Sequence, residues 1–440
     1  MSNLELGLWS FPALLVLIFL RIPIALAMLL AGLVGTYLIM GSPAPILSRL
    51  KGETYSTFSS YSLSIIPLFL LMGQFASLGG MSQSLFNAAN SWLGHRKGGV
   101  AMSAIGACAG FGAICGSSLA TAATMAQVAL PELKRYGYSG ALATGTLAAG
   151  GTLGILIPPS VVLVIYAILA EQNIAKLFMA AFIPGILAAI GYMIAIAIYV
   201  RLYPDSAGSS PRQPYGVRFK ALFDVWPVLL VFLAVVGGIY TGWFTPTEAA
   251  AVGAAGTGLI AWINGGLTRK TLLDSILMTA SASAMIFFIV FGAAFYNSFL
   301  ALSQMPTAAA TFITSQGFDP WMVMVGILIF YIILGCFMDS LSMILLTIPV
   351  FFPIVSALDY GLGPEEFALW FGILVLIVVE VGLITPPVGM NLFVINSMDR
   401  STPIVETYKG VLPFVISDVI RTMLLLSFPF ITLLLVRLLY

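Results

Sequence analysis

Two pairs of adjacent prolines mark the positions where this sequence departs most from an ordinary apolar helix. One pair lies in GTLGILIPPS (residues 151–160) and the other in VGLITPPVG (residues 381–389). A helix interior loses about 3 kcal/mol or more at each proline, and an unpaired backbone group in lipid costs several more. A break exposes carbonyl oxygens, which suit a small hard cation, and amide groups, which suit an anion. The neighbours that predict a sodium site at these breaks are Thr152, Gly154, Gly382 and Thr385.

Small polar residues also interrupt two long apolar runs, in GAICGSSLATAA (residues 112–123) and GCFMDSLSM (residues 335–343). Their hydroxyls and backbone carbonyls can complete an oxygen cage without a set of carboxylates. The residues concerned are Gly116, Ser117, Ser118 and Thr121 in the first stretch and Asp339, Ser340 and Ser342 in the second. The alternative interpretation is that each hydroxyl bonds back to its own helix or packs against a neighbouring one.

Three carboxylates fall within apolar runs, where ionisable groups are costly and are functional by default. Asp339 is predicted to coordinate a cation or to contact polar groups of a solute. Glu248 follows a Thr-Pro-Thr sequence, so a first-turn acid favoured by the helix dipole is the preferred interpretation. Glu380 precedes the second double proline. Its side chain could stabilise the structure there, protonated or hydrogen-bonded, or it could take part in ion coupling.

Composition identifies an integral membrane protein. Of 440 residues, 60% are hydrophobic and 8% are charged, whereas a globular domain carries roughly 25% charged residues. The net charge of +1 gives no long-range attraction to nucleic acid, and the three cysteines are predicted to be structural thiols. The sequence lacks a phosphate-binding G-x-x-x-x-G-K-[ST] motif and a zinc-binding H-E-x-x-H motif, so no enzyme and no cofactor are predicted. The apolar N-terminus is predicted to be a retained first span, because Glu5 replaces a basic n-region.

The chain divides into two halves in which apolar runs follow one another in the same order and with similar spacing. A polar connection, 202–224, separates residues 1–201 from residues 225–440. Ser118 precedes Pro131 by 13 residues, and Ser340 precedes Pro353 by 13. Internal symmetry with Gly/Pro-interrupted segments at matching positions is the best sequence pointer to the binding site of a secondary transporter. We therefore expect two inverted-topology repeats.

Each repeat is predicted to contain a re-entrant helical hairpin and a broken helix. The runs 98–131 and 321–357 are longer than one membrane crossing requires and are interrupted near the centre, as expected of hairpins. The runs 139–170 and 367–398 contain the double prolines and are the predicted broken helices. The expected fold is therefore an all-α polytopic membrane protein in which four interrupted elements meet at the membrane midplane.

Four motifs occurring in order resemble the large membrane (permease) subunit of tripartite ATP-independent periplasmic (TRAP) transporters of the C4-dicarboxylate type. They are GSSLATAA, GTLGILIPPS, GWFTPTEAAAVGA and EVGLITPPVG, and the resemblance covers essentially the whole chain. It implies a multi-pass subunit in the bacterial inner membrane that imports an organic acid by sodium symport. The mechanism implied is an elevator, with a transport domain that slides against a scaffold. The partners implied are a small membrane subunit and a periplasmic binding protein that delivers the carboxylate-bearing solute.

By the same resemblance, the first hairpin tip and first break form one sodium site, and their counterparts in the second half form another. Sodium is the coupling ion, and the best matches for solute contacts are Ser118, Ser160 and Asp339. The two halves differ, because Asp339 and Ser340 replace the Ser-Ser pair and Val388 replaces Ser160. Identical binding by the two halves is therefore not expected.

Two other functions compete with this interpretation. One is a stand-alone sodium and dicarboxylate symporter of similar architecture, which needs no binding protein. The other is a channel-like passive subunit, although the sequence lacks the rings of like charge expected of a channel. The sequence does not identify the organic acid, and the basic 202–224 connection favours a cytoplasmic position for that segment.

Overall fold

The chain folds into helices joined by turns and short loops. The computed structural model describes residues 2–440, and helices are the only regular elements in that part. Six of them are long and apolar enough to cross a membrane. The bent pair α8 (Gly140–Leu156) and α9 (Val161–Leu169), at 46°, adds a seventh span when counted as one. The predicted all-α, multi-span fold is confirmed.

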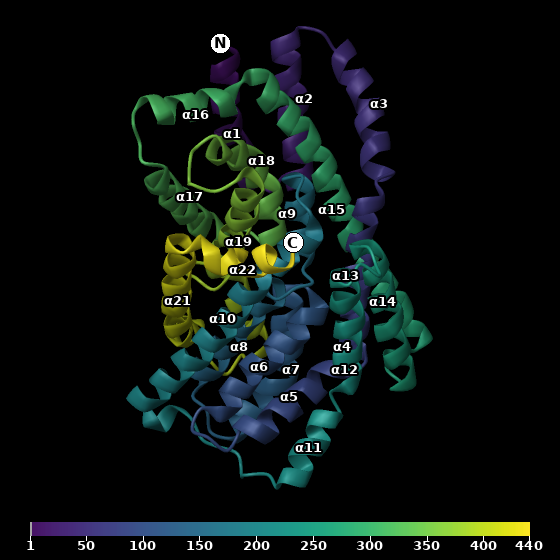
Figure 1. Cartoon of the computed structure of the whole chain (residues 1–440), viewed down its shortest axis with the longest axis vertical. Helices are drawn as coiled ribbons and strands as arrows, with labels where there is room; N and C mark the ends of the chain where they lie inside the picture. Colours follow the sequence, from purple (N-terminus) through teal and green to yellow (C-terminus); the bar gives the residue numbers. More distant parts are fainter. Residues whose placement is uncertain (1) are drawn as a thin grey trace.

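An outer layer runs along one flank of the molecule, where α2, α3, α14 and α15 lie (Figure 1). The first half contributes α1 (Asn3–Phe19), α2 (Ile24–Met40), α3 (Ala44–Phe58), η1 (Tyr61–Ser64) and α4 (Ile65–Leu78). The second half contributes α12 (Trp226–Phe232), the π-helical η3 (Leu233–Gly237), α13 (Gly238–Tyr240), α14 (Pro246–Ile263) and α15 (Arg269–Ser303).

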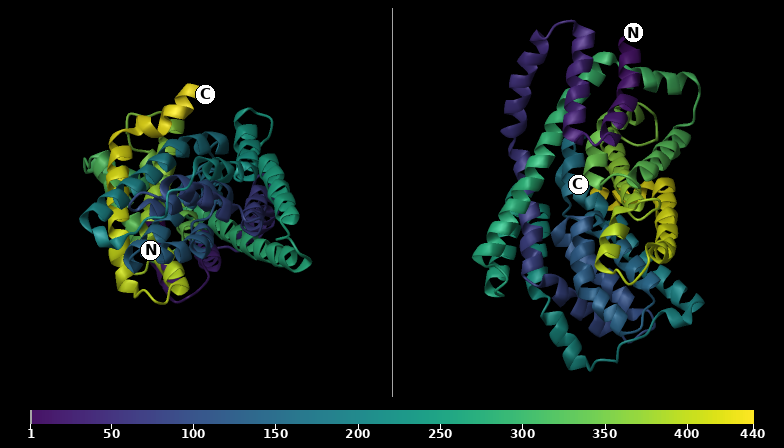
Figure 2. Two further views of the ribbon diagram at one scale, coloured as in Figure 1. Left: turned by 90° about the horizontal axis from the view of Figure 1, so that it is seen from below. Right: turned by 180° about the vertical axis from the view of Figure 1, so that it is seen from behind.

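The remaining helices form the body beside this layer, as the views from below and behind show (Figure 2). In the first half they are α5 (Met81–Leu93), α6 (Gly99–Cys115), α7 (Ser118–Arg135), α8, α9 and α10 (Ile174–Leu202). In the second half they are α16 (Met305–Ser315), α17 (Pro320–Gly335), α18 (Ser340–Ser356), α19 (Pro364–Leu383), α20 (Met390–Met398), α21 (Ile404–Ser427) and α22 (Pro429–Leu439). Each half thus has two helices that meet at a tip, then a helix interrupted at its double proline.

Helices of the two halves pack against each other reciprocally. Helix α2 packs against α15, and its counterpart α14 packs against α4. In the same way α7 contacts α20 while α18 contacts α9, and α8 contacts α21 while α19 contacts α10. Exchange of equivalent partners is what two interlocked repeats produce, and it agrees with the spacing of the landmarks in the sequence.

The centre of the body is apolar and tightly packed, with α19 as its most buried long helix. The apolar window of α19 is 94% buried, whereas the windows of the other five long spans are 39–44% buried. Lipid-facing helices retain exposed apolar side chains, whereas a helix that is apolar all round and buried belongs to a core. Helix α19 therefore holds its single intramembrane acid, Glu380, away from lipid.

The connection between the halves differs from the purely polar segment that the sequence predicts. Within residues 202–224 the structure forms a short η2 (Pro204–Ser206) and the helix α11 (Tyr215–Phe223). Helix α11 lies at the lower end of the view in Figure 1 and forms, together with α12, η3 and α13, one long apolar segment, Tyr215–Tyr240. The alternation of basic and aromatic residues in YGVRFKALF supports a helix with one face towards the protein and one away from it.

Candidate binding junctions

The first hairpin turns at Gly116 and Ser117. Gly116 ends α6 with a φ of +65°, a conformation that glycine adopts without strain, and Ser117 caps α7 by accepting a hydrogen bond from the Ala120 amide at 3.4 Å. Ser118 follows in the first turn of α7 and is 2% exposed. The tip therefore places Ser118 in a buried position beside the partly buried Ser117.

The first tip packs directly against the first break. A Cβ atom added at Gly154 would lie 2.7 Å from the Ser117 carbonyl oxygen and against the Thr121 hydroxyl. Gly116 faces the backbone of residues 159–161 in the same way. We call this contact, of residues 116–121 with residues 151–160, the first junction. Its Thr121 hydroxyl oxygen is buried without a hydrogen-bond partner, so an oxygen atom is available there for a cation.

The second tip meets the second break in an equivalent way. Gly335 and Gly382 approach so closely that a Cβ at Gly382 would lie 2.5 Å from the Gly335 Cα atom. The amide of Gly389 donates to the Cys336 carbonyl at 3.3 Å, and the Cys336 thiol donates to the Pro386 carbonyl at 3.4 Å. We call the contact of residues 335–342 with residues 380–389 the second junction. The structure thus brings the predicted tips and breaks together within each half.

Glu380 links the two junctions. Its side chain is 1% exposed, and its Oε1 atom accepts a hydrogen bond of 2.6 Å from the Ser340 hydroxyl. The Ser118 side chain of the first tip lies beside the same carboxyl. The Oε2 atom is buried without a hydrogen-bond partner. Because an isolated buried carboxylate is costly, this oxygen marks a second place suited to a cation.

The other predicted site residues have local roles in the structure. Ser160 is fully buried and caps α9 through the Leu163 amide at 3.4 Å, and Asp339 caps α18 through the Ser342 amide at 3.1 Å. The Thr385 hydroxyl bonds back to the Val381 carbonyl at 2.6 Å, as the alternative interpretation expected of such residues. Asp339 and Thr385 are partly exposed, so both remain accessible from the second junction.

Glu248 does not belong to either junction. It forms a capping box with Thr245 at the start of α14, where its Oε2 atom accepts from the Thr245 amide at 2.8 Å. The prediction of a first-turn acid is confirmed. The cysteines Cys108, Cys115 and Cys336 are free and buried, as predicted.

A buried charged network lies next to Glu380 and was not foreseen from the sequence. The Tyr192 hydroxyl donates to Asp418 at 2.8 Å and lies 2.9 Å from the Thr152 hydroxyl of the first break. Arg421 pairs with Asp418 at 2.9 Å, and both side chains are at least 95% buried. Asp418 lies inside the predicted apolar run 411–438 but was not among the intramembrane carboxylates recognised there. Opposite charges three residues apart in VISDVIRTM are the signal that identifies it.

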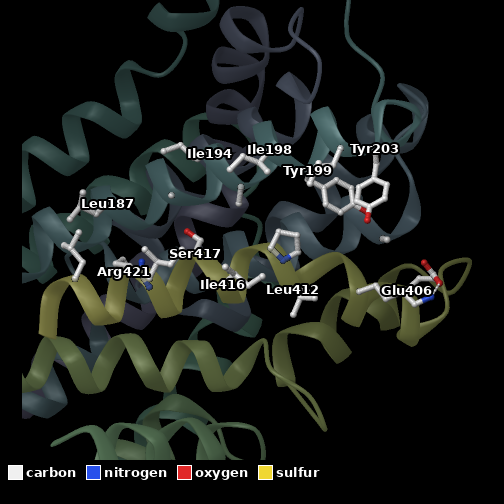
Figure 3. A pocket seen from close by; sticks show the side chains of 18 residues that line it. Leu187, Ile194, Ile198, Tyr199, Tyr203, Glu406, Leu412, Ile416, Ser417 and Arg421 are labelled. Carbon is white, nitrogen blue, oxygen red and sulfur yellow. Dashed lines mark hydrogen bonds and ion pairs between the residues drawn. The ribbon is translucent and has the colours of Figure 1, made fainter. Parts of the chain in front are cut away.

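A groove lies between α10 and α21, away from the two junctions. It holds about 820 Å³, and Figure 3 shows Ile194, Ile198, Leu412 and Ile416 along it, with Arg421 towards one end. These isoleucines and the leucine are more than half exposed. Such a surface faces hydrocarbon in a membrane protein, so the groove is a poor candidate for binding a polar solute.

The chemistry of the two junctions suits a monovalent hard cation. Within the described residues no three His, Cys, Asp or Glu side chains gather as a metal site, so a divalent metal cage is not formed by such ligands there. Each junction instead offers hydroxyl and carbonyl oxygens together with one unpartnered buried oxygen. These ligands match those of sodium sites built at broken helices.

The family comparison agrees with this arrangement. Residues 11–431 match the family model described as "Tripartite ATP-independent periplasmic transporter, DctM component". The chain belongs to this family. Membership identifies a multi-pass membrane transporter permease, and it implies a small membrane subunit, a periplasmic solute-binding partner and a place in the bacterial inner membrane.

Individual relatives support the assignment and differ in the solutes that their names give. The C4-dicarboxylate TRAP transporter large permease protein DctM of Pseudomonas aeruginosa is 36% identical over 87% of this chain and 88% of its own length. The sialic acid TRAP transporter large permease protein SiaM of Vibrio cholerae is 31% identical over 86% of each chain. The fold resembles the crystal structure of the YdaH transporter of Alcanivorax borkumensis, with a TM-score of 0.63 at 15% identity, covering 87% of this chain and 88% of that one.

Proposed function

We propose that this DctM-family chain imports a carboxylate-bearing organic acid by sodium symport and receives the solute from a periplasmic binding protein. The observation that carries the proposal is the meeting of each hairpin tip with a helix break, with an unpartnered buried oxygen at each junction. Irregular backbone at membrane depth is tolerated only where it is enclosed by protein or lines a cavity. Two buried contacts between a hairpin tip and a helix break are costly to form, and ion and solute binding explains them best.

The proposed sodium ligands come from both sides of each junction. The first junction would use oxygens of Gly116, Ser117, Ser118, Thr152 and Gly154, and the second would use Ser340, Gly382 and Thr385. Thr121, a candidate from the sequence, and Glu380 also belong to the set because the Thr121 hydroxyl and the Glu380 Oε2 atom lack hydrogen-bond partners. Solute would contact Ser118, Ser160 and Asp339. Asp339 is accessible in this conformation, whereas Ser160 is fully buried and would become available only after the first junction opens.

Transport would proceed by movement of the body against the outer layer. The hairpins, broken helices, α10, α21 and α22 would form the mobile unit, and α1–α4 with α12–α15 would form the scaffold. Coupling follows because a partly loaded unit carries an uncompensated charge, which is costly to move through the membrane interior. Glu380 would help to enforce this rule, since it is in contact with one tip and beside the other.

The proposal is tested by solute uptake into proteoliposomes that contain this chain and its small membrane partner. Uptake is measured with and without a sodium gradient, and with and without the binding protein, in the absence of ATP. Uptake that requires both the gradient and the binding protein is expected. Sodium-driven uptake that is indifferent to the binding protein would establish the stand-alone symporter instead, and downhill flux without sodium dependence would establish a passive subunit.

A further inference from the structure

Three arginines gather where the connection between the halves returns to α5. We define the basic cluster as Arg96, Arg212 and Arg218. Arg218 lies on α11, is 4% exposed and donates through Nε to the Gln213 carbonyl at 2.9 Å. Its guanidinium lies 5.1 Å from the ring centroid of Tyr215 and 5.7 Å from that of Trp92. These contacts fix the orientation of the guanidinium.

The fixed guanidinium retains an unused hydrogen-bond donor. The Nη2 atom of Arg218 is buried without a partner, and so is the Nε1 atom of the neighbouring Trp92. Buried donors in folded proteins are nearly always paired, because an unpaired one costs free energy. An acceptor from outside the chain would satisfy them.

The cluster also lacks an acidic counter-charge. In the part of the chain that the structure describes, none of the ion pairs includes Arg96, Arg212 or Arg218. Arg96 and Arg212 are exposed. His95 lies among them: burial and the nearby Arg218, Arg212 and Arg96 lower the pKa of its imidazole, which disfavours a fourth positive charge. The site therefore presents one fixed guanidinium, that of Arg218, and two exposed ones, those of Arg96 and Arg212, to an anion.

The surroundings of the cluster identify the kind of anion. Helix α11 also exposes apolar side chains, namely Val217, Leu222 and Phe223, together with the outer parts of Tyr215 and Phe219, whose rings contact Arg218 and Trp92. Aromatic side chains beside basic ones are typical of the level of lipid headgroups. Guanidinium groups bind phosphate through two parallel hydrogen bonds. A ligand with a phosphate and an apolar body matches both surfaces.

We propose that the basic cluster binds the phosphate of an anionic phospholipid, whose acyl chains lie against the exposed face of α11. This site is separate from the two junctions and does not depend on the solute that they carry. Helix α5, which holds Trp92, packs against both α11 and α6. A bound lipid would therefore fix the connection between the halves beside the first hairpin.

Native mass spectrometry of the purified full-length chain in detergent tests the proposal. The chain is titrated with phosphatidylglycerol, with phosphatidylcholine as the neutral lipid and with inorganic phosphate as the anion without acyl chains. The test variant is Arg96→Gln combined with Arg212→Gln, two exposed positions that leave the stacked Arg218 in place. The matched control is Arg269→Gln combined with Arg400→Gln, which removes two exposed arginines elsewhere.

We expect phosphatidylglycerol to remain bound to the wild type and the control, with affinity about tenfold or more weaker in the test variant. Equal affinity in both double variants would overturn the proposal. Binding of inorganic phosphate as tight as that of phosphatidylglycerol would assign the site to a free anion instead. Loss of the small membrane subunit on co-purification of the test variant, with lipid binding unchanged, would assign the cluster to protein docking.

Discussion

The two junctions share one backbone arrangement but differ in charge. Six residues before the first proline of each pair lies Thr152 in the first half and Glu380 in the second. Eight residues after Pro184 lies Tyr192, and eight after Pro413 lies Arg421. Hydroxyl groups in one half thus correspond to an acid and a base in the other. This difference indicates that the backbone arrangement common to both halves determines where ions can bind. The side chains at equivalent positions determine which half carries charge.

The junctions also differ in enclosure. Pro158, Pro159 and Ser160 of the first break are buried, whereas Pro386 and Pro387 of the second are exposed. The exposed break contains one more residue before its second helix, so Gly389 with a φ of +67° takes the N-cap position instead of Val388. The first junction is therefore the neutral, enclosed one, and the second is charged and open on one side.

In the network that joins Asp418 to both halves, stability is expected to depend far more on the charged Arg421 of the second half than on its counterpart Tyr192 of the first. Arg421→Met leaves Asp418 buried without its cation, a loss of about 3–5 kcal/mol in stability. Tyr192→Phe removes one hydroxyl from the same acid and costs about 1–3 kcal/mol. Thermal unfolding in detergent measures both. Recovery of stability when Asp418→Leu is added to Arg421→Met is the diagnostic result, and equal, small losses in the two single variants would contradict the comparison.

The close approach of glycines is expected to matter equally in both junctions. Gly154→Ala and Gly382→Ala each place a methyl group against backbone atoms, and overpacking of this kind costs about 1–3 kcal/mol. Gly326 is the matched control, because it lies in α17 with open space around it. We expect Gly326→Ala to leave the unfolding temperature unchanged or raised. Tolerance of alanine at one junction only would show that the two contacts are not equivalent.

An ion pair after the second broken helix gives that half a pH dependence. Asp399 is buried and lies 2.6 Å from the Lys134 ammonium. Burial alone would raise the pKa of Asp399, but Lys134, Ser401 and Thr402 lower it to about 2. The pKa of Asp399 in the folded protein lies below its ordinary value of 3.8. The ionised Asp399 side chain therefore stabilises the fold fully above about pH 4, and this contribution is lost as the pH falls towards 2.

We expect Asp399→Asn to lower the stability at pH 7 by about 1 kcal/mol, since Lys134 is partly solvated, and to flatten the loss between pH 4 and 2. Unfolding temperatures measured across that range check this. The exposed pair Lys409 and Glu406 is the control. Glu406→Gln should leave the dependence of unfolding temperature on pH unchanged. If Asp399→Asn showed the same dependence as the wild type, Asp399 would not be the source of the acid sensitivity.

The smallest difference between the halves is at the opening helices. Helix α14 begins with the capping box of Thr245 and Glu248, whereas α2 begins at Pro23 without a side-chain cap. Glu248→Gln keeps a hydrogen-bond acceptor and should cost less than about 1 kcal/mol, with sodium activation of uptake unchanged. A large change in sodium activation would place Glu248 in the transport mechanism after all.

The tips and breaks could be predicted because their signals are local. Glycine, proline and serine act on the backbone within a few residues, so Gly116, Ser117 and both double prolines indicate where helices end. Asp339 takes the N-cap position that Ser117 holds in the first hairpin, as their alignment suggests. The hydrogen bond from Ser340 to Glu380 was not predictable, because it depends on how α18 packs against α19.

The network around Asp418 shows the other limit. The Asp418 partner Tyr192 lies 226 residues earlier in the chain, and Thr152, which contacts Tyr192, lies on another helix, so no local pattern relates them. The pairing of Asp418 with Arg421 was readable, because both lie in one helix three residues apart. Treating 411–438 as a uniform apolar run concealed it.

The most direct test of the central claim is equilibrium binding of ²²Na⁺ to the purified chain. Wild type, Ser118→Ala, Ser340→Ala and the control Glu248→Gln are compared. The account predicts sodium binding to the wild type and the control, with weaker binding when either serine is removed. Unchanged sodium binding in both serine variants would show that the junctions are not the sodium sites.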